Sequence, residues 1–233
     1  MLFLAVSLGF YAENFRESII HKEQVKTNMQ SLLSDLRTDL ILYDSVIQRN
    51  TYSVAMSDSL IELFHNNISN TREIYFTARA VTANIGYCYT NSKSFEQMKN
   101  AGILRFVHPH SLLDSIGNYY VAFQWLREQT DMLKLKLDAI HKGNSALFDS
   151  YFFYKMMKNT SIYSRIASAS ISMISHPEGN PPLLSNEARD INNVSLNYHY
   201  YSTTARFYIR IITVLQGRAL RLVQSIKNEY HLE

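Results

Sequence analysis

A long stretch without glycine or proline is the feature that most restricts the fold of this chain. Neither residue occurs from Ala12 through Ile85, and the whole sequence of 233 residues has only 7 Gly and 4 Pro. Sandwiches and barrels need a turn about every 8–12 residues, which a sequence so poor in turn-forming residues does not supply. The single Cys88 excludes an internal disulfide framework and a zinc site built from cysteines. We therefore expect an all-α protein.

Apolar residues recur at spacings of three and four from residue 29 onward, as they do on one face of an amphipathic helix. We predict that residues 13–50 form a long stalk helix, which is also the first helix of a bundle. Asp35, Arg37 and Asp39 fall off the apolar stripe. The stripe, which we expect to pack inside the bundle or against a partner, consists of Met29, Leu32, Leu33, Leu36, Leu40, Tyr43 and Ile47.

Residues 51–233 are predicted to form the remaining helices of the bundle domain. A loop is expected over residues 175–187, which hold three of the four prolines. The two long helices at the ends of the chain suggest an antiparallel pair. The expected helices cover residues 50–67, 71–89 with an end near Gly86, a short stretch before Gly102, 108–143, 146–172 and 187–230.

Local signals mark some of the expected helix ends. Ser94 and Gln97 have the spacing of a capping box. Gly102 is placed as the glycine that follows a helix, and residues 103–107 are expected to be extended. Gly143 is expected to end or bend its helix.

The first twelve residues carry no charge, and charged residues then follow at once. A helix of this length covers only about 18 Å, whereas a membrane span needs about 20 residues. No basic residue precedes the apolar run and no A-x-A-like site follows it, which argues against a signal peptide. We predict that residues 1–12 are the outer part of a transmembrane helix whose inner part is missing from this chain or is supplied by a partner. A buried hydrophobic N-terminus is the alternative. The predicted anchor residues are Leu2, Phe3, Leu4, Val6, Leu8, Phe10 and Tyr11.

Two stretches carry a resemblance to a known family. "FLAVSLGFYAENFRESIIHKEQVKTNMQSLLSDLRTDL" follows the pattern of an apolar helix ending in L-G-(hydrophobic)2-A-E-N-x-R-E, then a charged helix, then S-L-x-x-D-L-x-x-D. "SFEQMKNAGILRFVHPHSLLDSIGNYY" follows a second pattern that ends in paired aromatic residues. In both, the chain resembles an uncharacterised Bacteroidota family of small N-terminally membrane-anchored helical proteins, a domain of unknown function.

The resemblance implies a single-pass anchor in the inner (cytoplasmic) membrane, a C-terminal domain in the periplasm, and no assigned chemistry. Members of the family carry a longer apolar run before the "LAVSLGF" position, so we expect this chain to be truncated there or to have a misplaced start.

Tyrosine is unusually frequent, with 16 residues against one tryptophan. A bundle core with tyrosine hydroxyl groups at its edges is the ordinary interpretation. The functional interpretation is an aromatic-lined groove for a small ligand such as a glycan or peptide. Its candidate residues are Tyr119, Tyr120, Tyr151, Tyr154, Tyr198 and Tyr201.

No sequence signature of catalysis, cofactor binding or metal binding is present. His108 and His110 flank a proline without a third ligand nearby, so surface histidines are the simpler interpretation. The net charge of +3 gives no support to a nucleic-acid partner. Four arginines of the last helix indicate a solvated face, or a face toward acidic lipid or a partner: Arg206, Arg210, Arg218 and Arg221.

These observations predict an extracytoplasmic antiparallel helical bundle with a long N-terminal stalk helix that continues from a partial transmembrane helix. We expect an interaction protein rather than an enzyme, and no cofactor. The expected partners are membrane lipid and either further copies of the chain or another membrane protein. An accessory or scaffold subunit of a membrane complex is the first hypothesis. A sensor-like ligand-binding module is the alternative.

Overall fold

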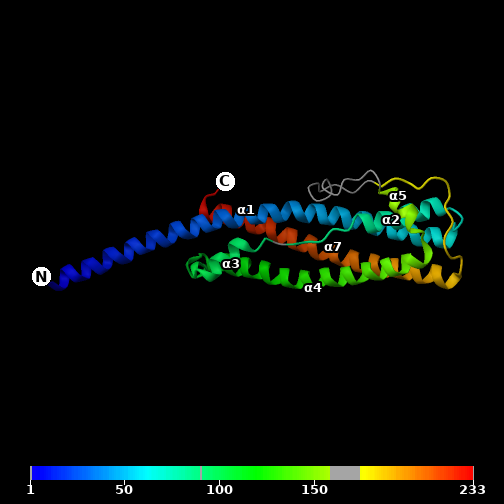
Figure 1. Ribbon diagram of the computed structural model, residues 1–233. Helices are drawn as coiled ribbons and strands as arrows, with labels where there is room; N and C mark the ends of the chain where they lie inside the picture. The colour runs from blue at the N-terminus through cyan, green and yellow to red at the C-terminus, as the bar shows by residue number, and fades with distance from the viewer. Residues whose placement is uncertain (1, 90, 158–173, 233) are drawn as a thin grey trace. The chain divides into compact units, whose positions relative to one another are not determined.

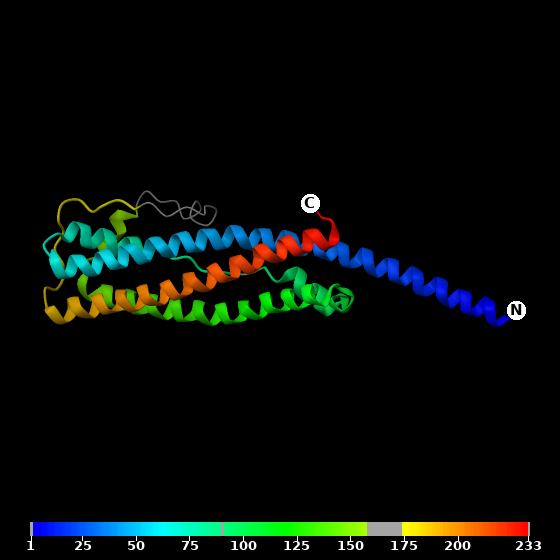
Figure 2. The same ribbon diagram turned by 180° about the vertical axis from the view of Figure 1, so that it is seen from behind.

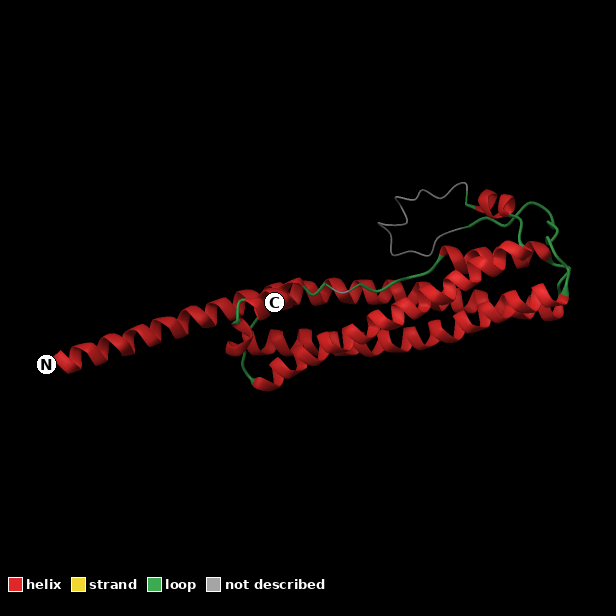
Figure 3. Ribbon diagram, turned by 60° about the horizontal axis from the view of Figure 1, so that its bottom comes forward, coloured by secondary structure: helices red, strands yellow, loops and turns green. Residues whose placement is uncertain are grey.

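The computed structural model describes residues 2–89, 91–157 and 174–232. Across those ranges the chain is all-helical and contains no strand, which confirms the all-α part of the prediction (Figure 3). The elements are α1 (Leu2–Asn66), α2 (Thr71–Ala83), α3 (Lys93–Asn100), the 3-10 helix η1 (Ile103–Phe106), α4 (His110–Leu147), α5 (Ser150–Met156) and α7 (Ala188–Tyr230) (Figure 1).

The chain divides into two compact units, each built from segments distant in sequence. Unit 1 comprises Met1–Ile41, Thr90–Phe123 and Leu215–Glu233. Unit 2 comprises Leu42–Tyr89 and Gln124–Val214. The three longest helices, α1, α4 and α7, each contribute a segment to both units.

Unit 1 is a small helical bundle in which parts of α1, α4 and α7 lie side by side with α3 and η1 (Figures 1 and 2). Four residues of the predicted stripe, Met29 to Leu36, are buried in its core, and Leu40 is half-buried. The opposing core residues are Met98, Val107, Leu112, Ile116, Tyr119, Leu215, Ala219, Leu222 and Ile226. The stripe is therefore covered by the chain itself.

Unit 2 holds a core rich in tyrosines, and several of their hydroxyl groups have partners inside the protein. Tyr198 accepts a hydrogen bond from Asn144 Nδ2 (3.0 Å) and donates one to the Ala78 carbonyl (3.3 Å). The Tyr208 hydroxyl accepts from the Cys88 amide (2.9 Å), and burial raises the pKa of Tyr208 to about 12. Such bonds allow large, partly polar side chains to be buried at little cost. Tyr43 of the stripe is also buried here, and Ile47 is half-buried.

The predicted helix break at residue 50 is wrong, because α1 continues without interruption to Asn66. Asn50 is buried, and its Nδ2 donates to the carbonyl groups of Val46 (2.8 Å) and Gly86 (2.9 Å). Asn50, which the sequence suggests as a helix boundary, thus lies inside the helix, and its side-chain NH₂ group has hydrogen-bond partners there. A Cβ on Gly86 would lie 3.1 Å from the Cα of Val46, so this close approach favours glycine.

The predicted capping box is also wrong. α3 begins at Lys93, and Ser94 lies inside its first turn with its amide donating to Asp35 Oδ2 (3.0 Å). Residues 103–106 form η1 rather than an extended segment, although Val107 is extended. Gly102 takes the left-handed conformation (φ 68°) that was predicted for the residue after the helix.

The later helices agree with the sequence except near Gly143. α4 passes through Gly143 and ends at Leu147, because this glycine allows close packing: an added Cβ would lie 2.7 Å from Asn197 Nδ2. α5 begins at Ser150 rather than at residue 146, and residues 158–173 of the helix predicted there lie outside the described part of the chain. The predicted loop over residues 175–187 and the last helix are confirmed.

Candidate functional site

The first segment of α1 is helical but lies against nothing else in unit 1. Every described side chain from Val6 through Ile20 is exposed, including Leu8 (67%), Phe10 (70%) and Tyr11 (75%). Phe3 is exposed as well (81%), whereas the side chains of Leu2 and Leu4 lie outside the described residues. In Figures 1 and 2 this segment extends away from the other helices of its unit.

The charge boundary of this segment is sharp. Glu13 accepts a hydrogen bond from Arg16 Nε (3.1 Å) one turn later, at the position where the uncharged run ends. Among the helices that the structure describes, none combines the length and the apolar character that crossing a bilayer requires.

A buried pair of carboxylates forms the most organised polar site of unit 1. Asp35 and Asp39 lie one turn apart on α1 and are 9% and 1% exposed. Asp35 Oδ1 accepts from Asn91 Nδ2 (2.6 Å) and its Oδ2 from the Ser94 amide (3.0 Å). Asp39 Oδ1 accepts from the Asn91 amide (3.1 Å) and its Oδ2 from the Tyr119 hydroxyl (2.9 Å). Each of the four carboxylate oxygens therefore has a donor.

Electrostatics at this pair favour a proton on Asp39. Burial raises the pKa of Asp39 to about 6, and the nearby charge of Asp35 adds to that rise. The hydrogen bonds from Asn91 and Tyr119 act in the opposite direction, because they stabilise the carboxylate. Tyr120 stacks on Phe95 beside the pair (ring centroids 4.2 Å apart), and burial raises its pKa. Asp39 can therefore hold a proton below about pH 6, and the pair joins three segments of the chain through hydrogen bonds.

Sequence reasoning missed this site, since Asp35 and Asp39 were interpreted as lying off the buried stripe. Their positions in the sequence could have indicated it. Asp35 and Asp39 are four residues apart and adjoin Leu36 and Leu40, so both carboxylates lie one above the other at the edge of the apolar face. The two stretches that carry the family resemblance meet here: the first contains both aspartates, and the second contains Ser94 and the paired tyrosines.

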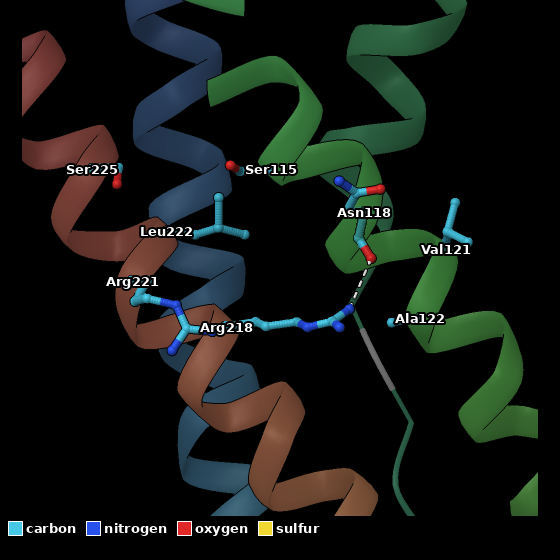
Figure 4. Close-up of a pocket in the computed structure, with 8 residues that line it drawn as sticks. All are labelled: Ser115, Asn118, Val121, Ala122, Arg218, Arg221, Leu222 and Ser225. Carbon is cyan, nitrogen blue, oxygen red and sulfur yellow. Dashed lines mark hydrogen bonds between the residues drawn. The ribbon is translucent and has the colours of Figure 1, made fainter. Parts of the chain in front are cut away.

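A separate hollow of about 520 Å³ lies between α4 and α7 in unit 1 (Figure 4). Arg218 reaches from α7 toward α4, where its Nη1 lies 3.5 Å from the carbonyl oxygen of Asn118. Arg221 lines the same hollow, whose floor is the buried Leu222. Two of the four arginines singled out in the sequence thus border one hollow. Of the other two, Arg206 forms an ion pair with Asp58 in unit 2.

The six tyrosines of the predicted groove do not share one environment. Tyr119 and Tyr120 are buried in unit 1, and Tyr198 and Tyr201 are buried in unit 2. Tyr151 and Tyr154 are exposed on α5. The aromatic-lined groove therefore stays a prediction, without a cavity described at these side chains.

The remaining candidates occupy ordinary places. The rings of His108 and His110 are exposed and 5.5 Å apart, on either side of Pro109. Cys88 is buried.

Comparison with known proteins adds no relative: no family model, curated protein or solved structure matches the chain. The resemblance to the Bacteroidota family rests on the two sequence patterns alone.

Proposed function

We propose that the protein is a membrane-anchored, extracytoplasmic helical interaction protein that serves as an accessory or scaffold subunit of a membrane complex. The observation that carries this proposal is the part of α1 from residue 2 to residue 12, which has no charge and whose described side chains are all exposed. An amphipathic helix that packs on a protein exposes one polar face, whereas a helix that enters lipid is apolar all round. Lipid is therefore the environment that suits this segment.

The length of the segment limits how it meets the bilayer. Residues 2–12 supply about 17 Å of helix, somewhat more than half of the ~30 Å hydrocarbon layer. Phe10 and Tyr11 precede the first charges, at the level where aromatic side chains gather at a membrane interface. The ion-paired Glu13 and Arg16 then lie in the headgroup region or beyond it.

Placement of the bundle in the periplasm, with a single-pass anchor in the inner membrane, follows from the family resemblance. The antiparallel course of the bundle is supported by contacts between α4 and α7. In unit 2, Trp125 contacts Phe207 and Lys136 lies over the Tyr200 ring, so residue numbers rise along α4 as they fall along α7.

Vesicle flotation tests the anchor. The full chain is mixed with vesicles of phosphatidylethanolamine and phosphatidylglycerol and centrifuged through a density gradient. Wild type is expected to float, and Leu8→Lys is expected to bind about a hundredfold more weakly, since a lysine in the apolar layer costs about 3 kcal/mol.

Ile41→Lys is the matched control, because Ile41 lies on the same helix and is 69% exposed, close to the 67% of Leu8. It is expected to float like wild type. Equal flotation of Leu8→Lys and Ile41→Lys, or failure of wild type to float, contradicts the anchor.

Purification in a gentle detergent from the native membrane tests the subunit role. We expect a membrane protein to elute with this chain in fixed stoichiometry, identified by mass spectrometry. A protein that elutes alone, or only with its own copies, contradicts the role of accessory subunit.

A further inference from the structure

The outer face of α4 and α7 in unit 2 exposes an unusual number of large apolar side chains. Their exposed fractions lie between 42% and 63%, although both helices also bury a full core face. We call this surface the α4–α7 outer face. Its apolar members are Trp125, Met132 and Leu135 on α4, and Leu196, Tyr200, Phe207 and Val214 on α7.

Helix geometry gathers these residues into one continuous surface. Tyr200, Phe207 and Val214 are seven residues apart, as are Trp125 and Met132, so each set recurs on one side of its helix. At about 100° per residue, the α4 members fall within about 80° of arc, and so do the α7 members. The Trp125 and Phe207 rings touch edge to face, with centroids 5.9 Å apart, and join the two helices.

The size of the surface lies at the upper end of what monomers expose. The three aromatic members have about 200 Å² each and the four aliphatic ones about 150 Å² each, so at roughly half exposure the seven present about 600 Å². The largest apolar patches on monomers cover about 300–600 Å², and each partner in a standard interface contributes about 800 Å². The outer face is therefore large enough to supply most of one side of such an interface.

Charges of both signs lie within this face. Glu128 is on α4 between Trp125 and Met132, and Arg210 is on α7 between Phe207 and Val214. In the part of the chain that the structure describes, neither forms an ion pair or a hydrogen bond. A third charge, Lys136 of α4, lies over the Tyr200 ring. Desolvating a lone charge is costly, so lipid does not suit this face. A surface that carries charges of both signs is complementary to a copy of itself.

We propose that the α4–α7 outer face is the interface of a symmetric dimer, in which the face of one copy packs on the same face of a second copy. Glu128 of each copy then pairs with Arg210 of the other. This inference rests on the proposed interaction role and names the first partner as the chain itself. In such an interface every substitution occurs twice.

Sedimentation of the full chain in a nonionic detergent tests the dimer. Wild type is expected to form dimers at micromolar concentration. Val214→Lys is expected to raise the Kd of the dimer by at least about tenfold, because it places a charge among the apolar side chains of the interface. Leu220→Lys is the matched control: Leu220 is 55% exposed against 51% for Val214, but lies about 120° away around the same helix.

Charge reversal tests the dimer independently, without changing the apolar packing. Glu128→Arg and Arg210→Glu are each expected to weaken the dimer, and the double variant is expected to regain most of the lost affinity. A monomeric wild type, equal weakening by Val214→Lys and Leu220→Lys, or a double variant weaker than either single one overturns the proposal.

The same measurement on Leu8→Lys separates this inference from the anchor. Dimers that persist in Leu8→Lys and vanish in Val214→Lys assign self-association to the outer face, whatever the vesicle test shows. Dimers that vanish in Leu8→Lys alone assign it to the N-terminal segment and overturn the proposed interface.

Discussion

Replacing Asp39 with asparagine is expected to change how the stability of the protein depends on pH. The pKa of Asp39 is raised from 3.8 to about 6 by burial. Between these two values the folded protein keeps a proton that the unfolded chain releases, so stability falls as pH rises through this interval. A pKa difference of this size corresponds to about 3 kcal/mol, which is lost completely above pH 6.

Asparagine removes the charge and keeps most of the hydrogen bonds. Its amide oxygen can accept from the Asn91 amide, and its NH₂ group can donate to the Tyr119 hydroxyl, which accepts as readily as it donates. Asp39→Asn and wild type are therefore expected to be similarly stable below pH 4. At pH 8 the variant is expected to be more stable by up to about 3 kcal/mol.

Urea unfolding of the full chain, followed by circular dichroism at several pH values in a nonionic detergent, measures the difference. Asp114→Asn, which removes an exposed carboxylate from α4 in the same unit, is the control for a general charge effect. A stability difference between Asp39→Asn and wild type that is equal at pH 4 and pH 8 refutes the reasoning. Tyr119→Phe removes one hydrogen-bond donor to the Asp39 carboxylate and is expected to raise the pKa of Asp39 further. The pH interval over which stability falls should therefore extend to higher pH.

Three further substitutions test the packing by urea unfolding. Leu36→Asp places a charge at a fully buried site of the stripe and is expected to unfold unit 1 or cost more than about 3 kcal/mol; unchanged stability would contradict the core assignment. Gly86→Ala puts a Cβ 3.1 Å from the Val46 Cα and is expected to cost about 1–3 kcal/mol. Gly117→Ala, on α4 with open space around it, is expected to add about 0.5–1 kcal/mol, so equal effects of the two alanines would refute the role of close approach.

The sequence predicts helix ends well where the residues that end them act locally. Asn70 caps α2 by accepting from the Glu73 amide (3.4 Å), within the polar stretch that was expected to separate two helices. Gly102 adopts the left-handed conformation after α3. In both places the deciding atoms lie within a few residues of one another, so the local sequence contains the information.

Sequence-based predictions are wrong where a distant segment supplies the deciding contact. Asn50 stays inside α1 because Gly86, 36 residues away, accepts its side-chain hydrogen bond. Ser94 lies inside α3, and its amide, which would pair with Gln97 in a capping box, donates instead to Asp35, 59 residues away. Gly143 stays helical because Asn197 packs where a side chain would be. None of these partners can be identified from periodicity or turn residues.

Periodicity in the sequence predicts which side of a helix is apolar, but it does not predict whether that side is buried. The carboxylate pair and the outer face illustrate the difference. The stripe of α1 and the stripe of Tyr200, Phe207 and Val214 look alike in the sequence, yet the first is buried and the second is exposed. Charges beside each stripe separate the two cases. Asp35 and Asp39 have a donor from the same chain for every oxygen, because a buried charge requires one.

Glu128 and Arg210 have no such partner among the residues that the structure describes, although both lie among large apolar side chains. A face that combines large apolar side chains with charges of both signs suits packing against a copy of itself. In such a pair each Glu128 meets an Arg210 of the other copy, so that both charges gain the partner that the described part of the chain does not give them. This is why we name a second copy as the partner of the outer face.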